Sequence, residues 1–143
     1  MPAEALFAGS LLSDTFVRLA AIVLLTVVTI AFGGTFVLRV VQGAVPATAL
    51  QKSFFRAGHA HAGVLVTLGL VVCLVVDLAG VSGLTAVLST GVLWGAILIP
   101  AGFFLSVAHK GAEKPNQLIA LLWLGAASVA VGVVAAAVGL LTL

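Results

Sequence analysis

Four long apolar runs dominate this chain and leave it few ways to fold. They cover about residues 19–39, 57–78, 84–108 and 117–142. A helix needs about 20 mostly apolar residues to cross a bilayer core, and lipid offers no partner for an unpaired backbone polar group. We therefore predict an all-α, polytopic membrane protein in which residues 1–143 form a single four-helix transmembrane bundle. Turn-forming glycine and proline residues separate the runs, at Gly43, Pro46, Gly80, Gly83, Gly111 and Pro115.

The composition excludes several other classes of protein. Of the residues, 63% are hydrophobic and 7% are charged, whereas a soluble domain carries roughly 25% charged residues. So few charges cannot coat a water-facing surface, which excludes a soluble globular protein and a disordered chain. The six basic residues form no patch of the kind that binds nucleic acid. The one cysteine, Cys73, excludes a disulfide framework and a cysteine-type metal site.

The distribution of Lys and Arg predicts how the bundle is oriented. The first and third loops hold five of the six basic residues, namely Arg39, Lys52, Arg56, Lys110 and Lys114. The opposite side of the membrane holds only Arg18. Cytoplasmic loops of membrane proteins are enriched in Lys and Arg. We therefore expect an N-out/C-out protein of the plasma (inner) membrane of a bacterium.

Small residues mark the faces on which membrane helices can approach closely. Gly91 and Gly95 are four residues apart in the third run, and Ser128 and Gly132 have the same spacing in the fourth. Two interpretations stay open: inward packing within one chain, or the seam of a homodimer. Pro100 lies inside the third run. Because proline removes a backbone hydrogen bond, we expect a kink beside it.

Ionisable and polar residues gather at the predicted cytoplasmic end of the bundle. Such residues are costly in a membrane and indicate function. The second run opens with Arg56, His59 and His61, which are our candidate catalytic residues. Arg56 and His59 share a helix face, on which Gly63 would leave space beside the imidazole. His61 lies about 200° round the helix, so the two histidines cannot grip one metal ion, and we predict no metal site.

The remaining candidates would bind substrate. Gly63 is on the second run itself, and the others are at the neighbouring helix ends, namely Arg39, His109, Glu113, Asn116 and Gln117. An imidazole titrates near neutral pH and can act as general acid or base, and a guanidinium can hold an anionic or polar group. The sequence contains no cofactor motif. We therefore expect a cofactor-free isomerase or mutase that acts on a small apolar or lipid-like substrate.

Two other functions stay open. His61 and His109 lie on different predicted helices at the same depth, and they could be the axial ligands of a haem or could bind a metal. The chain could also be a non-catalytic accessory subunit of a membrane complex. Transport is less favoured, because the predicted midplane of the membrane offers hydroxyl groups and no ionisable side chain.

Three stretches resemble an uncharacterised family of actinobacterial four-helix membrane proteins. They are Leu50-Gln51-Lys52, the segment 55–65 with its Gly58-His59-Ala60-His61 core, and the segment 100–106 that begins with Pro100. The resemblance covers most of the chain. It implies a four-helix membrane fold and brings no activity with it.

A second resemblance is to the hydroxylaminobenzene mutases, which are small four-span membrane enzymes. It rests on Ala60-His61-Ala62-Gly63 at the start of the second span, Gly111 after the third and Gln117 near the fourth. This resemblance implies a mutase reaction. The chain departs from the family at Ala62, where those enzymes tend to carry an acidic residue.

Overall fold

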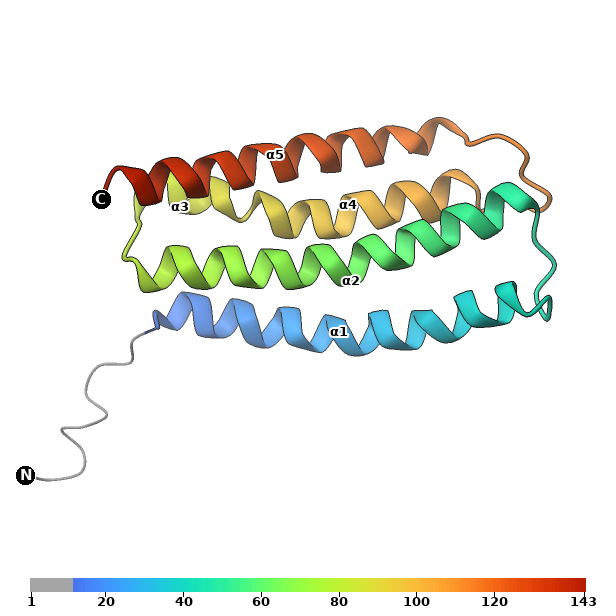
Figure 1. Ribbon diagram of the computed structural model, residues 1–143, viewed down its shortest axis with the longest axis horizontal. Helices are drawn as coiled ribbons and strands as arrows, with labels where there is room; N and C mark the ends of the chain where they lie inside the picture. Colours follow the sequence, from blue (N-terminus) through green and yellow to red (C-terminus); the bar gives the residue numbers. More distant parts are fainter. Residues whose placement is uncertain (1–11) are drawn as a thin grey trace, which may run out of the picture.

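The chain folds into four long apolar helices, as the sequence predicts. The computed structural model describes residues 12–143, which contain helices and no strand (Figure 1). The elements are α1 (Asp14–Val41), α2 (Ala49–Leu78), α3 (Gly83–Ser89), α4 (Gly91–Ser106), the short 3-10 helix η2 (Gln117–Ile119) and α5 (Ala120–Leu141). With α3 and α4 taken as one span, and η2 and α5 as another, four helices are long and apolar enough to cross a membrane. The chain is therefore a multi-pass membrane protein.

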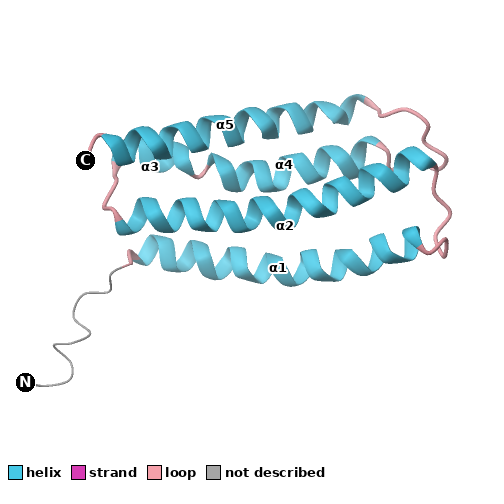
Figure 2. Cartoon of the chain, in the orientation of Figure 1, coloured by secondary structure: helices cyan, strands magenta, loops and turns pink. Residues whose placement is uncertain are grey.

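The helices run up and down, so all connections lie at the two ends of the bundle (Figure 2). One end holds the α1–α2 loop and the α4–α5 connection, and we call it the basic end. The opposite end holds the start of α1, the α2–α3 loop and the C-terminus, and we call it the terminal end (Figure 1). Gly43 and Gly111 turn the chain at the basic end with φ of 80° and 70°, a backbone conformation that favours glycine.

Helix α2 begins at Ala49, eight residues before the start of the predicted second span. The Thr48 side chain accepts a hydrogen bond from the Gln51 backbone N–H (3.1 Å), and the Gln51 side chain accepts one from the Thr48 N–H (3.0 Å). This capping box satisfies two backbone donors at the helix start. The first turns of α2 carry Lys52 and Arg56, so a search for uncharged runs misses them although they are helical.

The third span is interrupted about two turns after its start, at Thr90. Helix α3 ends at Ser89 and α4 begins at Gly91, with Thr90 between them. Helix α4 then continues through Pro100 to Ser106. The span has a break at Thr90, where the backbone N–H donates to Val87 O instead of continuing the helical pattern, and the kink expected beside Pro100 stays a prediction.

Glycines allow α4 and α5 to pack closely. The small residues of the third and fourth spans therefore lie where these two helices meet. A Cβ atom added to Gly91 would lie 2.6 Å from Ser128 O, and one added to Gly132 would lie 2.7 Å from Val92 N. The Ser128 hydroxyl also donates a hydrogen bond to Gly91 O at 2.8 Å. Gly91, Gly95 and Gly132 therefore lie at the contact between α4 and α5 within one chain, and a homodimer stays a prediction.

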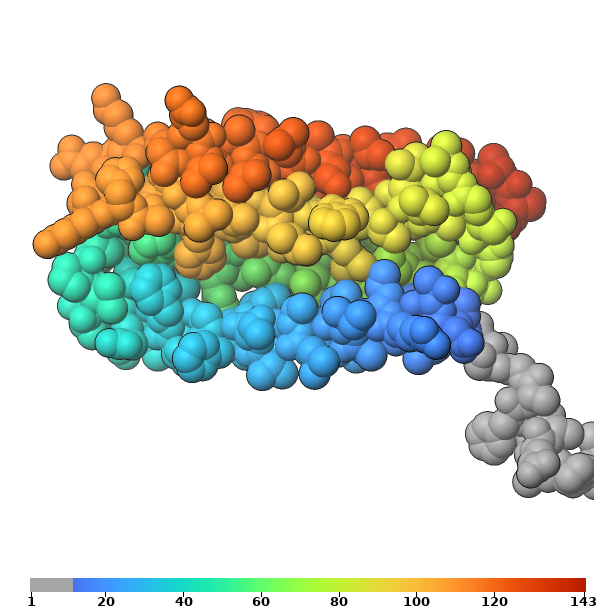
Figure 3. All heavy atoms as spheres, turned by 180° about the vertical axis from the view of Figure 1, so that it is seen from behind, coloured from blue at the N-terminus to red at the C-terminus, as the bar shows by residue number. Residues whose placement is uncertain are grey.

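Helix α1 lies at the edge of the bundle. Among the helices of residues 12–143 its backbone comes close to α2 alone. Of the 18-residue apolar segment that would span the membrane, 6% is buried in α1 and 33% in α2. Its first residues are tied to the end of α2, because Ser13 donates to Asp77 through its backbone N–H (2.9 Å) and through its hydroxyl. A furrow of about 480 Å³ separates α1 from α4, with α2 visible behind it (Figure 3).

Candidate functional site

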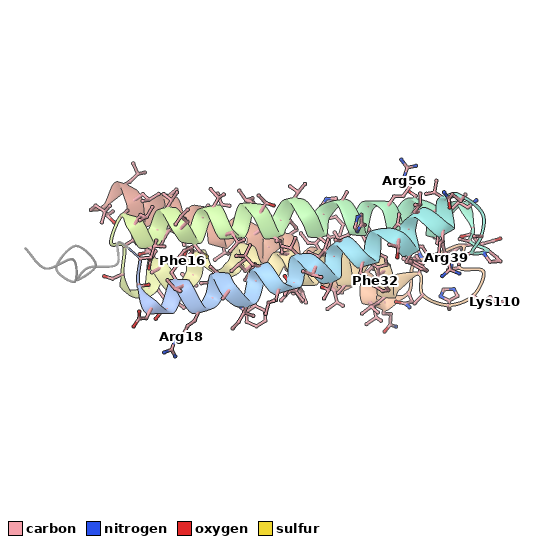
Figure 4. The ribbon with its side chains drawn as sticks, turned by 90° about the horizontal axis from the view of Figure 1, so that it is seen from below. Phe16, Arg18, Phe32, Arg39, Arg56 and Lys110 are labelled. Carbon is pink, nitrogen blue, oxygen red and sulfur yellow. The ribbon has the colours of Figure 1, made fainter. Side chains whose placement is uncertain are left out.

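The predicted site residues lie in the half of the bundle nearer the basic end, except Gly63, which is at the middle of α2. Arg39 is in the last turn of α1, while Arg56, His59 and His61 lie in the first half of α2. His109, Glu113 and Asn116 lie between α4 and η2, and Gln117 is the first residue of η2. Figure 4 shows Arg39, Arg56 and Lys110 at one end of the molecule and Arg18 at the other. The labelled cations are therefore divided between the two ends of the bundle, with three at the basic end and Arg18 at the terminal end.

The two histidines of α2 point to different neighbours, as their spacing predicts. His61 is exposed, its Nδ1 lies 2.7 Å from Ala57 O, and its ring is 5.2 Å from the Phe103 ring of α4. His59 is partly buried against α1, where a Cβ atom on Gly34 would come within 3.2 Å of its ring. The absence of a side chain at Gly34 therefore provides the space that the His59 ring occupies.

His59 lies at one end of an apolar groove on the outer face of α2, beside α1. The groove has a volume of about 650 Å³, and we call it the His59 groove. Its lining residues are Ile30, His59, Ala60, Gly63, Val64, Thr67, Leu68 and Val71. Two of them carry a polar side chain. The Thr67 hydroxyl donates to Gly63 O at 3.0 Å, whereas the His59 ring makes no hydrogen bond to any residue of the described chain.

Gly63 and Arg56 differ in their relation to this groove. Gly63 lines it, and a Cβ atom added there would meet no atom within 4 Å, so this glycine leaves open space one turn below His59. Arg56 is exposed, and its guanidinium points away from the helices (Figure 4). It forms no ion pair within residues 12–143. His59 and Gly63 therefore come together in one groove, while Arg56 and His61 lie outside it.

Among the candidates from His109 to Gln117, the Asn116 side chain forms hydrogen bonds that stabilise the fold, and the other side chains form none within the described residues. The Asn116 side chain donates to Leu105 O (3.2 Å) and accepts from Leu118 N–H (2.8 Å), so it joins the end of α4 to the start of η2. His109, Glu113 and Gln117 are exposed, as is Arg39 on α1. None of these four side chains forms a hydrogen bond or an ion pair within the described part of the chain.

Gln51 is the polar residue at the basic end whose importance the sequence interpretation missed. It is 6% exposed, and its Nε2 donates to both Val107 O and His109 O at 3.0 Å. Beside it, the Thr48 hydroxyl donates to Ala112 O at 2.6 Å. Together, these hydrogen bonds of Gln51 and Thr48 join the start of α2 to the segment that follows α4. The Thr-x-x-Gln pattern at 48–51 is a recognised capping-box signal and could have identified this helix start.

The titratable residues of the described chain do not assemble into a metal-ligand cluster. No group of three His, Cys, Asp or Glu side chains that could hold a metal ion occurs within residues 12–143. Asp77 lies at the terminal end, bonded to Ser13, and Cys73 is buried in the same half of α2. The imidazole in the apolar groove is thus the most unusual polar group near the basic end.

Comparison with known protein families, with curated proteins and with solved structures finds no match to this chain. The two resemblances that rest on short motifs stay predictions. The function therefore has to follow from the residues of the groove, their burial and their hydrogen-bond partners.

Proposed function

We propose that this chain is a multi-pass protein of a bacterial cell membrane that binds a lipid-like molecule in the His59 groove. The observation that carries the proposal is an imidazole without a hydrogen-bond partner in an otherwise apolar groove. A polar group left unpaired in an apolar environment costs about 1–3 kcal/mol. A ligand with a polar group beside an apolar tail would supply the missing hydrogen bond and fill the groove.

The depth of His59 along the helix suits such a ligand. Helix α2 has 30 residues, which makes it about 45 Å long and longer than a hydrocarbon core of about 30 Å. His59 lies about 15 Å from the first residue of α2. If α2 is centred in the bilayer, the hydrocarbon begins about 7.5 Å along the helix, so the imidazole lies about 7.5 Å inside it, in the leaflet on the side of the basic end. Hydrocarbon offers no hydrogen-bond partner at this depth, so a polar group of a bound molecule would have to supply one.

The length of the groove also suits one acyl chain. The groove extends along α2 from His59 to Val71, a rise of about 18 Å. One leaflet contributes about 15 Å of hydrocarbon, half of the bilayer core. The groove is therefore long enough for one acyl chain, and because His59 is already about 7.5 Å inside the hydrocarbon, a chain lying along the whole groove would extend past the midplane.

Proton transfer is the chemistry that His59 would add if the bound molecule is a substrate. A neutral imidazole can remove a proton from one atom of the substrate, and the resulting imidazolium can return it to another. Substrate and product then have the same composition, which is the balance of an isomerase and requires no cofactor. Among the three candidate catalytic residues His59 alone lines the groove, so it would carry this step.

The basic end would face the cytoplasm in this proposal. It holds Arg39, Lys52, Arg56, Lys110 and Lys114, whereas Asp14 and Asp77 lie at the terminal end beside Arg18. The positive-inside rule favours this orientation, with both termini outside. The His59 end of the groove would then lie in the cytoplasmic leaflet of the membrane.

A groove-filling substitution tests the proposal. Gly63→Leu would place a side chain in the groove without meeting another protein atom at its Cβ, and Gly33→Leu is a matched control on α1, where the added Cβ also meets no atom within 4 Å. Mass spectrometry of the purified proteins would measure the lipid-like molecules that remain bound. We expect a several-fold loss for Gly63→Leu and none for Gly33→Leu. Equal amounts in both variants would contradict the proposal.

A further inference from the structure

We infer that the molecule in the His59 groove is a phospholipid with a net negative headgroup, held by Arg56 and Lys52. This inference rests on the proposed function and adds the chemistry of the ligand's head. It depends on three features of the described chain: the alignment of the two cations with the groove, their lack of protein partners, and the scarcity of acidic residues at the basic end.

The cations are aligned with the groove along one face of α2. Lys52, Arg56, His59 and Gly63 follow one another at spacings of four, three and four residues. At 100° per residue they fall within an arc of about 60°. His59 and Gly63 line the groove, and Lys52 and Arg56 are exposed on the same face nearer to the helix start. A chain lying in the groove would therefore have its head beside the two cations.

Neither cation is neutralised by the protein. Lys52 and Arg56 form no ion pair within residues 12–143, and the guanidinium of Arg56 is turned outward (Figure 4). Glu113 is the one acidic residue of the basic end in the described chain, and it is exposed in the α4–α5 connection, also without an ion pair there. The two positive charges are thus available to a phosphate group.

Phosphate is the anion that this arrangement suits. The two cations precede the imidazole by about one and two helical turns, or about 5 and 10 Å, at the depth where headgroups replace hydrocarbon. Arginine forms two parallel hydrogen bonds with a phosphate, and a Lys or Arg side chain at a membrane surface attracts anionic lipid. The imidazole below them would pair with the glycerol or ester region of the same lipid.

A lipid competition experiment tests the inference. The full chain would be reconstituted into vesicles of equal parts phosphatidylglycerol and phosphatidylcholine with the same acyl chains, then extracted, and bound lipid quantified by native mass spectrometry. We expect an excess of bound phosphatidylglycerol in the wild type. Arg56→Gln should lower that excess about fivefold, the effect of one interfacial charge. The control is Lys114→Gln, which removes an exposed cation of the same end outside α2 and should leave the excess unchanged.

The outcomes separate this inference from the proposed function. Equal binding of the two lipids by the wild type, or the same loss in Arg56→Gln and Lys114→Gln, would overturn the anionic headgroup and leave a groove that binds lipid. Binding of neither lipid by the wild type would overturn the proposed function itself. A phosphatidylglycerol preference that Arg56→Gln lowers and Lys114→Gln retains supports both.

Discussion

Gln51 is buried and His59 is partly buried at the basic end. These two polar side chains differ in whether the described chain supplies their hydrogen-bond partners. The Gln51 amide bonds to three backbone groups, two acceptors and one donor, that lie at the start of α2 and after α4. The His59 imidazole has no such partner in the described chain. A satisfied polar group is explained by the fold that it stabilises. An unsatisfied one in an apolar groove needs another explanation, and we attribute it to a ligand.

Replacing Gln51 should destabilise the protein. Gln51→Leu removes the donor for Val107 O and His109 O and the acceptor for Thr48 N–H, and buried groups left unpaired cost about 1–3 kcal/mol. We expect the free energy of unfolding, measured by denaturant titration in detergent, to fall by about that amount. Gln42→Leu is the control, because Gln42 is exposed. A fall of the same size in both variants would contradict this role.

Gly34 should determine where the His59 ring lies. Gly34→Ala adds a Cβ atom about 3.2 Å from two ring atoms of His59, so the ring has to move towards the groove. Gly33→Ala adds a Cβ atom that meets nothing within 4 Å. We expect the ring signals of His59 in NMR spectra to shift in Gly34→Ala and to remain unchanged in Gly33→Ala. Unchanged His59 signals in both variants would show that the ring is not packed against Gly34.

At the scale of the elements, glycine contacts hold α4 against α5. A Cβ atom on Gly102 would lie 2.5 Å from Leu122 N, a backbone atom that cannot move aside easily. We expect Gly102→Ala to lower the free energy of unfolding in detergent by about 1–3 kcal/mol, the usual cost of overpacking. Gly33→Ala provides the reference for an open position. Equal stability of the two variants would indicate that α4 and α5 do not approach closely at Gly102.

The sequence predicts these elements well where hydrophobicity alone defines them. The four spans follow from runs too apolar for any other fold, and the close packing of α4 on α5 follows from Gly91, Gly95 and Gly132. Helix α2 begins at Ala49, before the predicted second span, because Lys52 and Arg56 interrupt the apolar run without interrupting the helix. The break at Thr90 has no marker as strong as a proline, and the proline that is present is accommodated inside α4.

The candidate site was predictable in part, because helical periodicity and the order of the loops can be read from the sequence. Helical periodicity alone separates His59 from His61 by about 200°, and the order of the loops brings the polar residues to one end. What the sequence does not contain is the rotation of α1 about α2, which places Gly34 against His59 and leaves Arg56 outward. Such rotations depend on side-chain packing between two helices rather than on a motif in either one.

At the scale of the whole molecule, the proposed orientation can be measured by chemical labelling. In a Cys73→Ala background, Thr142→Cys places a thiol at the terminal end and Glu113→Cys places one at the basic end; both positions are exposed. A membrane-impermeant maleimide applied to intact cells should label Thr142→Cys at once. It should label Glu113→Cys only after the membrane is permeabilised. The reverse pattern would place the basic end outside and contradict the positive-inside interpretation.

The most direct test of our central claim compares the two histidines of α2 in their ability to retain lipid. Wild type, His59→Ala and His61→Ala would be released from phosphatidylglycerol-containing nanodiscs, and retained lipid would be counted by native mass spectrometry. We predict that wild type and His61→Ala keep a bound lipid, because the His61 ring is outside the groove against Phe103. His59→Ala should lose it. Equal retention by all three proteins, or a loss confined to His61→Ala, would contradict the claim that His59 anchors a lipid in this groove.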